Sequence, residues 1–339
     1  MKMIASIIAV ALVFSTAGAP AQTDAKAEAV VAPSGDTAAG TAEYPPAQGA
    51  EETLSKPQKA PPLPFHTIEG YGGGSITPMA YLVNPGAEGT IFGLPAAAYS
   101  QVFLPNGGKD LDAWTFTETL FRRLELGYGF NRLGLGTLPH DIAEATDIGI
   151  RRNHVLLHNF NARALLLEEN SFKLPLPALT FGTHFKYNDG IQAIDHRLGG
   201  ALKSIGLDKS NGVDYTLTAT KTFMIPKINR PLIVTAGMRG SQAAQVGLLG
   251  FSDKFTPSFE GNVAFLPTDW LLLAYEIRQK KSPYGQIPGL IGEEDSWNAI
   301  DASWIINSHM TLVAGWGSFG NVTNTRENGA WWLQFKYEI

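Results

Sequence analysis

The chain has 339 residues, a small net charge of −5 and no cysteine. This charge gives no basic face for DNA or RNA, and the lack of cysteine excludes disulfides, zinc thiolate sites and a lipid anchor on an N-terminal cysteine. Charged residues make up 17% of the chain, below the roughly 25% typical of soluble proteins, while aromatic residues reach 10% and glycines number 36. The composition therefore favours one main, glycine-punctuated β domain.

The N-terminal third of the chain is predicted to contain three segments that precede the main domain. Residues 1–21 have the pattern of a signal peptide, with basic Lys2, an apolar run and a small-x-small cleavage form ending at Ala21; an ordinary N-terminal helix is the alternative. Residues 22–64 are rich in Ala, Pro, Glu and Lys and lack apolar periodicity, which predicts a disordered linker. Residues 65–93 are Gly-rich, and we interpret them as a lead-in strand or a plug.

Residues 94–339 alternate between apolar and polar side chains in stretches of about ten residues, the length a tilted strand needs to cross a bilayer. In the last stretch Trp331, Leu333 and Phe335 alternate with Gln334 and Lys336. No run of 18 apolar residues follows the signal peptide, so a membrane-spanning helix is not predicted. We therefore predict an all-β fold, a closed antiparallel up-and-down transmembrane barrel of about 12 strands. The strands are expected near residues 95–104, 113–121, 122–133, 153–168, 176–188, 211–223, 231–241, 254–266, 269–280, 296–306, 308–318 and 329–339.

Connection lengths and aromatic residues give this barrel an orientation. Short connections such as 226–231 and 267–269 alternate with long ones such as 134–153 and 190–211, as in outer-membrane barrels with tight periplasmic turns and long external loops. Aromatic residues fall in two groups, one expected at each membrane interface. The periplasmic group is Phe265, Trp270, Trp304 and Tyr337, and the outer group is Phe130, Tyr187, Trp297, Trp316 and Trp331.

Several blocks carry a resemblance to a known family. They are Ile76 to Tyr81, Phe185 to Gly190, Ser210 to Asp214, Leu266 to Trp270 and Gly315 to Asn321. Over about residues 66–339 the chain resembles bacterial domain-of-unknown-function family 3034. The resemblance implies an exported envelope protein of a Gram-negative bacterium, and it implies no activity, substrate or catalytic residue.

Motifs of enzymes and metal sites are weak in this chain, so no enzymatic activity, cofactor or metal is predicted. Gly70 to Gly74 lacks the Lys-Ser/Thr of a phosphate loop, and no G-x-S-x-G elbow occurs. No histidine has a serine two positions later, as a barrel phospholipase would require. His154 and His158 would lie about 13 Å apart on a strand, too far to share a metal. The acidic run 293–295 could hold a divalent cation, although a solvated loop is the more common role.

The predicted polar face of the strands is the best candidate for a functional surface. Charges of both signs there would either line a polar pore or bridge a narrow lumen and close it, and a barrel of about twelve strands has an intermediate interior. The residues predicted to line the lumen are Arg123, Glu125, Asn159, Asn161, Arg163, His184, Lys186, Arg239, Glu260, Glu276, Arg278, Lys336 and Glu338.

The sequence thus predicts an outer-membrane channel or uptake protein for a small polar solute. The alternatives are a closed structural barrel, an outer-membrane enzyme without a recognisable motif, and a soluble periplasmic β-sheet protein that binds a ligand. The expected partners are outer-membrane lipid, lipopolysaccharide and, through the C-terminal strand, the barrel-assembly machinery. No nucleic-acid partner is expected.

Overall fold

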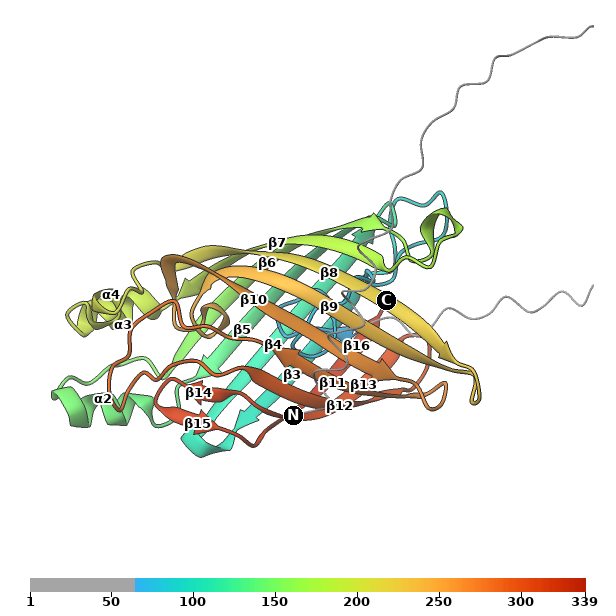
Figure 1. Cartoon of the computed structure of the whole chain (residues 1–339). Helices are drawn as coiled ribbons and strands as arrows, with labels where there is room; N and C mark the ends of the chain where they lie inside the picture. Colours follow the sequence, from blue (N-terminus) through green and yellow to red (C-terminus); the bar gives the residue numbers. More distant parts are fainter. Residues whose placement is uncertain (1–64) are drawn as a thin grey trace, which may run out of the picture. The chain divides into compact units, whose positions relative to one another are not determined.

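The computed structural model describes residues 65–339, and the predicted signal peptide and linker lie outside the described residues. Twelve antiparallel strands form a closed barrel, as predicted (Figure 1). The strands are β3 (Ala96–Leu104), β4 (Lys109–Leu120), β5 (Leu124–Gly134), β6 (His154–Leu167), β7 (Ala178–Asp189), β8 (Asn211–Ile225), β9 (Arg230–Ala243), β10 (Phe251–Phe265), β11 (Leu271–Arg278), β12 (Trp297–Ile305), β13 (Met310–Ser318) and β16 (Ala330–Glu338).

Each of these strands pairs with its neighbour in the chain, and the last strand closes the barrel on the first. β16 pairs with β3 in a register that runs from Trp331 opposite Phe103 to Glu338 opposite Ala96. Closure leaves no barrel strand with an unpaired edge, which a sheet in a bilayer needs because lipid offers no hydrogen-bond partner.

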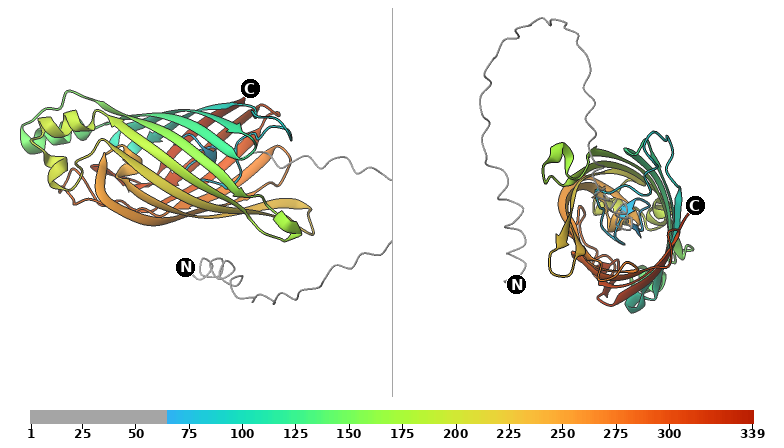
Figure 2. Two further views of the ribbon diagram at one scale, coloured as in Figure 1. Left: turned by 90° about the horizontal axis from the view of Figure 1, so that it is seen from above. Right: turned by 90° about the vertical axis from the view of Figure 1, so that its right-hand side faces the viewer.

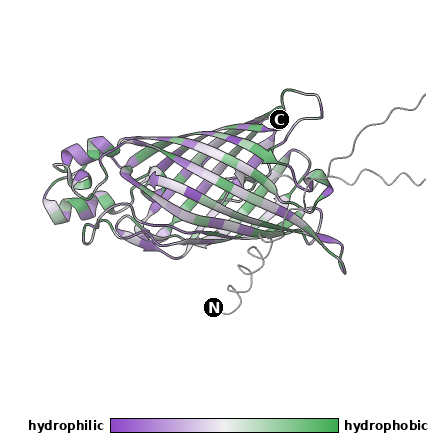
Figure 3. Cartoon of the chain, turned by 45° about the horizontal axis from the view of Figure 1, so that its top comes forward, coloured by the Kyte–Doolittle hydropathy of each residue, from purple (hydrophilic) through white to green (hydrophobic). Residues whose placement is uncertain are grey.

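The apolar side chains face outward and the polar ones face inward. Leu333 and Phe335 on β16 are exposed, whereas the intervening Gln334 and Lys336 are 1% exposed. The alternating colours along the strands in Figure 3 follow this pattern. A soluble sandwich would bury its apolar face between two sheets. The exposed apolar surface of a closed barrel instead matches lipid, so the protein belongs in the outer membrane.

Smaller elements lie between the barrel strands and before β3. They are β1 (Phe65–His66), β2 (Gly72–Gly73), η1 (Pro105–Gly107), α2 (Leu138–Thr146), η2 (Ser171–Lys173), α3 (Ile191–Arg197), α4 (Ala201–Ser204), η3 (Gln245–Gly247), β14 (Gly320–Val322) and β15 (Thr325–Glu327). Within residues 65–339, no helix has the length and apolar character needed to cross a membrane.

The connections differ between the two ends of the barrel, but the predicted strict alternation has exceptions. At one end, the loop end, lie the long connections with α2, α3 and α4 (Figure 1). At the other, the turn end, most strands are joined by short turns such as 226–229. Two connections depart from the rule: 105–108 is a tight turn at the loop end, and 168–177 is a longer connection at the turn end.

The predicted aromatic groups contain one wrong assignment. Trp270 and Trp304 are more than half exposed near the turn end, and Trp316 is 51% exposed on the outer wall, as expected for residues that meet lipid. Trp297 is only 6% exposed and packs against the buried ring of Phe319, with ring centroids 4.9 Å apart. It therefore points into the barrel, because it is the first residue of β12 on the inward-facing side of the alternation.

Candidate functional site

The lumen contains the first part of the segment before β3. We call residues 65–93 the inner segment. Its strands β1 and β2 pair with each other, and the residues from His66 to Val83 are almost all buried. The view along the barrel in Figure 2 shows this blue segment inside the ring of strands. The buried part of the segment therefore lies against the polar inner wall of the barrel.

Glu69 of the inner segment meets three cations that come from three different barrel strands. Its carboxylate pairs with Lys186 of β7, with Arg278 of β11 at 2.6 Å and with Arg239 of β9 at 3.7 Å. All four side chains are at most 2% exposed. Buried ionic groups require this kind of pairing. Without a partner, a buried carboxylate would gain a proton and a buried amine would lose one, because the charged form is too costly away from water.

The barrel contributes two further carboxylates to this cluster. Asp214 lies 2.7 Å from Lys186 and 3.1 Å from Arg239, and Glu260 lies 3.1 Å from Arg239. Three cations and two anions of the barrel leave one positive charge, which Glu69 neutralises. Removal of a charged partner from such a buried cluster strongly destabilises it, because the other charges stay desolvated.

Two other barrel carboxylates bind the main chain of the inner segment. Glu276 accepts hydrogen bonds from the backbone N–H groups of Ser75 at 2.7 Å and Thr77 at 2.8 Å. Glu125 accepts from the N–H groups of Gly72 at 3.0 Å and Val83 at 2.8 Å. The N–H groups of residues 75–77 converge on Glu276 and form an anion-binding concavity, whereas Glu125 joins two distant points of the segment. Both carboxylates hold the segment by its backbone.

Neutral and cationic side chains complete the attachment. Arg163 donates to the carbonyl of Gly72 at 2.7 Å and to Glu125 at 2.8 Å. Asn161 donates to the carbonyls of Glu69 at 2.8 Å and Gly70 at 3.0 Å. Asn161 Oδ1 also lies 2.8 Å from Nδ1 of His184. The inner wall thus provides hydrogen-bond partners for many of the backbone groups that the segment brings into the lumen, and other backbone groups bond within the segment.

Glycines make the close approach of the segment to the wall sterically feasible. Gly70 has φ +88°, and a Cβ there would lie 2.7 Å from the carbonyl oxygen of Tyr128. A Cβ at Gly74 would lie 2.3 Å from a carboxylate oxygen of Glu276. On the wall, a Cβ at Gly127 would lie 2.1 Å from the carbonyl oxygen of Gly70. The glycine run is therefore explained by packing between two backbones rather than by phosphate binding.

Most of the residues predicted to line the lumen lie in this contact region. Eleven of them are between 0% and 5% exposed on the inner wall: Glu125, Asn159, Asn161, Arg163, His184, Lys186, Arg239, Glu260, Glu276, Arg278 and Lys336. Glu338 is near the turn end and pairs with Lys336 at 2.5 Å. Arg123 does not line the lumen: it lies in the turn between β4 and β5, is about half exposed and pairs with Glu168 at 2.8 Å. β5 starts at Leu124, so Arg123 lies one residue before the strand and does not follow its alternation of inward and outward side chains.

Sequence reasoning missed several members of the site. Asp214 lies on the polar side of a threonine-rich strand and binds Lys186, and Asp301 accepts a hydrogen bond from Ser75 at 2.7 Å. Trp332 donates its indole N–H to Oγ of Ser75 at 3.1 Å. The available signal was that Asp214, Asp301 and Trp332 all occupy inward positions of alternating strands. Glu69 gave no signal, because the inner segment has no periodicity.

The remaining candidate sites of the sequence do not assemble a metal site. Glu294 pairs with Lys280 at 2.9 Å and Asp295 with Arg326 at 2.9 Å, so this acidic run is occupied by cations of the protein. Oη of Tyr128 lies 2.8 Å from Nδ1 of His158. Among residues 65–339, no group of three or more potential ligands converges on a common point.

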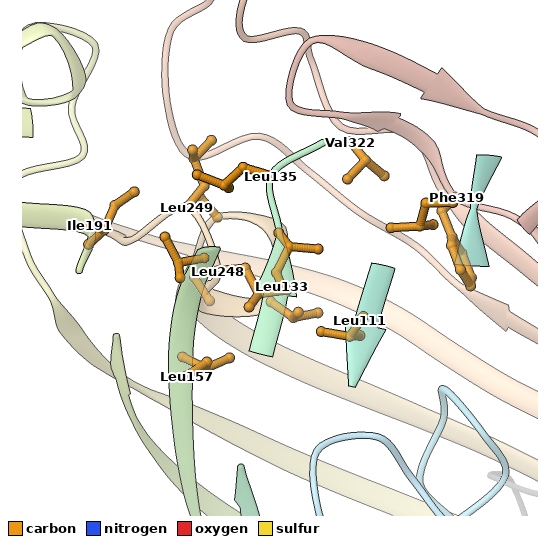
Figure 4. Packing of buried hydrophobic residues seen from close by; sticks show 14 of the residues in the cluster. Leu111, Leu133, Leu135, Leu157, Ile191, Leu248, Leu249, Phe319 and Val322 are labelled. Carbon is orange, nitrogen blue, oxygen red and sulfur yellow. The ribbon is translucent and has the colours of Figure 1, made fainter. Parts of the chain in front are cut away.

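Toward the loop end the character of the lumen changes from polar to apolar. On β5 the inward residues run from Glu125 through Asn131 to Leu133, and on β4 they run from Thr119 to Leu111. Figure 4 shows aliphatic side chains from the strands and loops meeting in this region. They enclose a cavity of about 160 Å³, which we call the outer chamber.

The family model for a protein of unknown function, DUF3034, matches residues 64–336. The chain belongs to the DUF3034 family. This match confirms the resemblance drawn from the sequence blocks. It covers the inner segment as well as the barrel, so both are parts of the DUF3034 unit. No match to a curated protein was found.

Solved structures similar to this DUF3034 barrel are outer-membrane proteins. The KdgM porin is 10% identical with a TM-score of 0.45, and the match covers 72% of this chain and 99% of the porin. The NanC porin is 9% identical with a TM-score of 0.42 over 72% of this chain and 100% of the porin. The COG4313 outer membrane channel from Pseudomonas putida F1 is 10% identical with a TM-score of 0.35 over 76% and 100%. Likeness at this level carries no argument about the solute of the DUF3034 protein.

Proposed function

We propose that this DUF3034 protein is an outer-membrane uptake channel whose gate is the inner segment. One observation carries the proposal: a segment of the chain itself occupies the lumen and is held by ion pairs and backbone hydrogen bonds to the wall. A barrel needed only as an anchor could fill its lumen with side chains of its own strands. A separate segment joined to the wall by polar contacts can leave as a unit when these contacts are replaced.

This geometry changes the role that we propose for the lumen charges. A small polar solute was expected to contact the lumen charges, but in this conformation Lys186, Arg239 and Arg278 are bound to Glu69. A polar solute would have to use these groups after the segment has moved. The lumen charges are therefore proposed as the docking site of the gate in the closed state and as the wall of the pore in the open state.

Orientation and partners follow the same proposal. The loop end would face the exterior and the turn end the periplasm, with the exposed apolar surface in contact with lipid. Contacts with lipopolysaccharide, and with the assembly machinery through β16, remain predictions. The absence of enzymatic activity also remains a prediction.

Single-channel recording in planar bilayers tests the gate. The full chain is expected to show rare, small openings, whereas a Glu69→Lys variant, which adds a fourth cation to the cluster, should stay open for most of the recording. A second variant without residues 65–93 should conduct steadily. Heat-modifiable migration on detergent gels verifies that each variant is folded. If both folded variants carry no current, the channel function is wrong and a closed structural barrel replaces it.

A further inference from the structure

The outer chamber has a chemistry that a pore for polar solutes does not need. Its lining contains no charged residue, and its polar members are limited to Ser75, Thr146, Gln245 and Thr323. The other lining residues are aliphatic or aromatic and come from barrel strands, loops and the inner segment. In outer-membrane barrels the interior is ordinarily polar, so an apolar chamber at one end of the lumen requires its own explanation.

From the outer chamber we infer a binding site for a small uncharged hydrocarbon, aliphatic or aromatic. The cavity of about 160 Å³ is close in size to an engineered apolar cavity of about 150 Å³ that stays dry and binds benzene. A charged or strongly polar ligand would lose its hydration and find no partner on these walls. An apolar molecule gains from the transfer, because its surface leaves water for a wall of similar chemistry.

Several residues that line the chamber are also exposed at the loop end. Thr146, the last residue of α2, and Ile148 are exposed and also line the chamber. Leu198, directly after α3, and Ala201, the first residue of α4, are half-buried and line it as well. The chamber therefore borders the surface beside α2, α3 and α4, and we place the entry of a hydrocarbon there.

The inner segment forms the floor of the chamber. Ile68 and Ile76 line the cavity and are 5% and 2% exposed. Ile68 directly precedes Glu69, and Ile76 lies between the two residues whose N–H groups bind Glu276. A molecule in the chamber thus contacts the segment beside its polar attachments. The step from binding to uptake rests on the proposed function, whereas binding itself does not.

Tryptophan fluorescence can detect a ligand in the chamber, because the seven tryptophans fall into two groups, one in the chamber and one on the outer face. Trp297 and Trp332 line the chamber, and the other five are exposed on the outer face: Trp114, Trp270, Trp304, Trp316 and Trp331. Replacement of these five by Phe in the full chain gives a reporter with only the two chamber tryptophans. The probe is 1-bromooctane, whose bromine quenches fluorescence on contact, added to the reporter in lipid nanodiscs.

We expect saturable quenching that unbrominated octane competes away. Val155→Phe in the reporter fills part of the chamber and should raise the half-quenching concentration at least fivefold. Leu156→Phe, the next residue of β6 on the outer face, is the matched control and should leave it unchanged. Bromobenzene should also quench saturably, while 8-bromooctanoate, which carries a charge, should quench at least tenfold more weakly.

Quenching that rises without saturation and is equal in the two Phe variants would mean that the probe only dissolves in the lipid, and the inference would be wrong. If 8-bromooctanoate quenches as strongly as 1-bromooctane, the inference that the ligand is uncharged is wrong. If Val155→Phe does not fold, competition by octane in the unmodified reporter still tests whether the hydrocarbon binds at a saturable site. Saturable quenching in a protein that never conducts would reject the channel and keep the site, so the two failures are distinguishable.

Discussion

Glu69 and Arg278 are 209 positions apart in the chain, yet Oε2 of Glu69 accepts a hydrogen bond from Nη1 of Arg278 at 2.6 Å. The contact joins the inner segment to β11, and Lys186 and Arg239 join the same carboxylate to two more strands. One side chain of the segment is therefore paired with cations of three strands of the inner wall.

Glu69→Gln should loosen the inner segment. Gln keeps the size of the side chain but removes the charge that three cations share, and loss of one partner from a buried ion pair costs about 3–5 kcal/mol. Hydrogen exchange of the amides of residues 72–83 should become much faster. Glu88→Gln is the control, because Glu88 is exposed in the same segment. Equal exchange in the two variants would contradict the role of Glu69.

Gly74→Ala should also displace the segment, for a steric reason. The new methyl group would lie 2.3 Å from a carboxylate oxygen of Glu276, and overpacking of this kind costs about 1–3 kcal/mol. The same exchange measurement should show weaker protection around Ser75 and Thr77. At Gly149 no heavy atom lies within 4 Å of an added Cβ, so Gly149→Ala should have no effect. Unchanged protection in Gly74→Ala would show that the segment is not packed this closely.

Acid should weaken the docking of the segment, first through His66. Burial, together with the nearby Lys336, holds the pKa of His66 well below its usual 6.5. The released segment therefore binds this proton more readily than the docked one, so docking weakens as the pH falls below about 6.5. Channel opening in planar bilayers should increase over this range. His66→Gln should remove the increase, and His140→Gln, at an exposed position of α2, should not.

A second acid step should come from Glu69 at lower pH. Burial raises the pKa of Glu69, but Arg278, Lys186 and Arg239 outweigh burial and hold the pKa well below the usual 4.5. Its contribution to docking is thus fully present above about 4.5 and is lost as the pH falls through the lower pKa of the docked state. This step should be absent from Glu69→Gln. Opening that decreases on acidification would contradict both assignments.

Phe259→Arg should destabilise the barrel itself. Phe259 is 63% exposed near the middle of β10 on the outer face, and a cation facing lipid there costs about 2–4 kcal/mol. Ser258→Asn, at the neighbouring inward position, should be tolerated because it remains polar and faces the lumen. The measurement is the urea dependence of unfolding in lipid vesicles. Equal losses at both positions would show that the face assignment is wrong.

The sequence by itself determined the barrel, its twelve strands and the direction of its two faces. Alternation of apolar and polar side chains is a local property, and a strand such as β16 displays it over a few residues, from Trp331 to Tyr337. The same reasoning located the inward charges Lys186, Arg239 and Arg278. It was wrong at Arg123, which precedes β5, and at Trp297, which faces inward at the start of β12.

Only the tertiary structure decided what these charges contact and how far the polar lumen extends. Glu69 lies in a segment without periodicity, so nothing local points to its partners on three distant strands. The outer chamber likewise combines strand residues such as Leu133 with residues of the connections, such as Ile194 of α3, which meet only when the barrel closes. Contacts between residues far apart in the chain depend on closure and register, and alternation along a single strand carries no information about either.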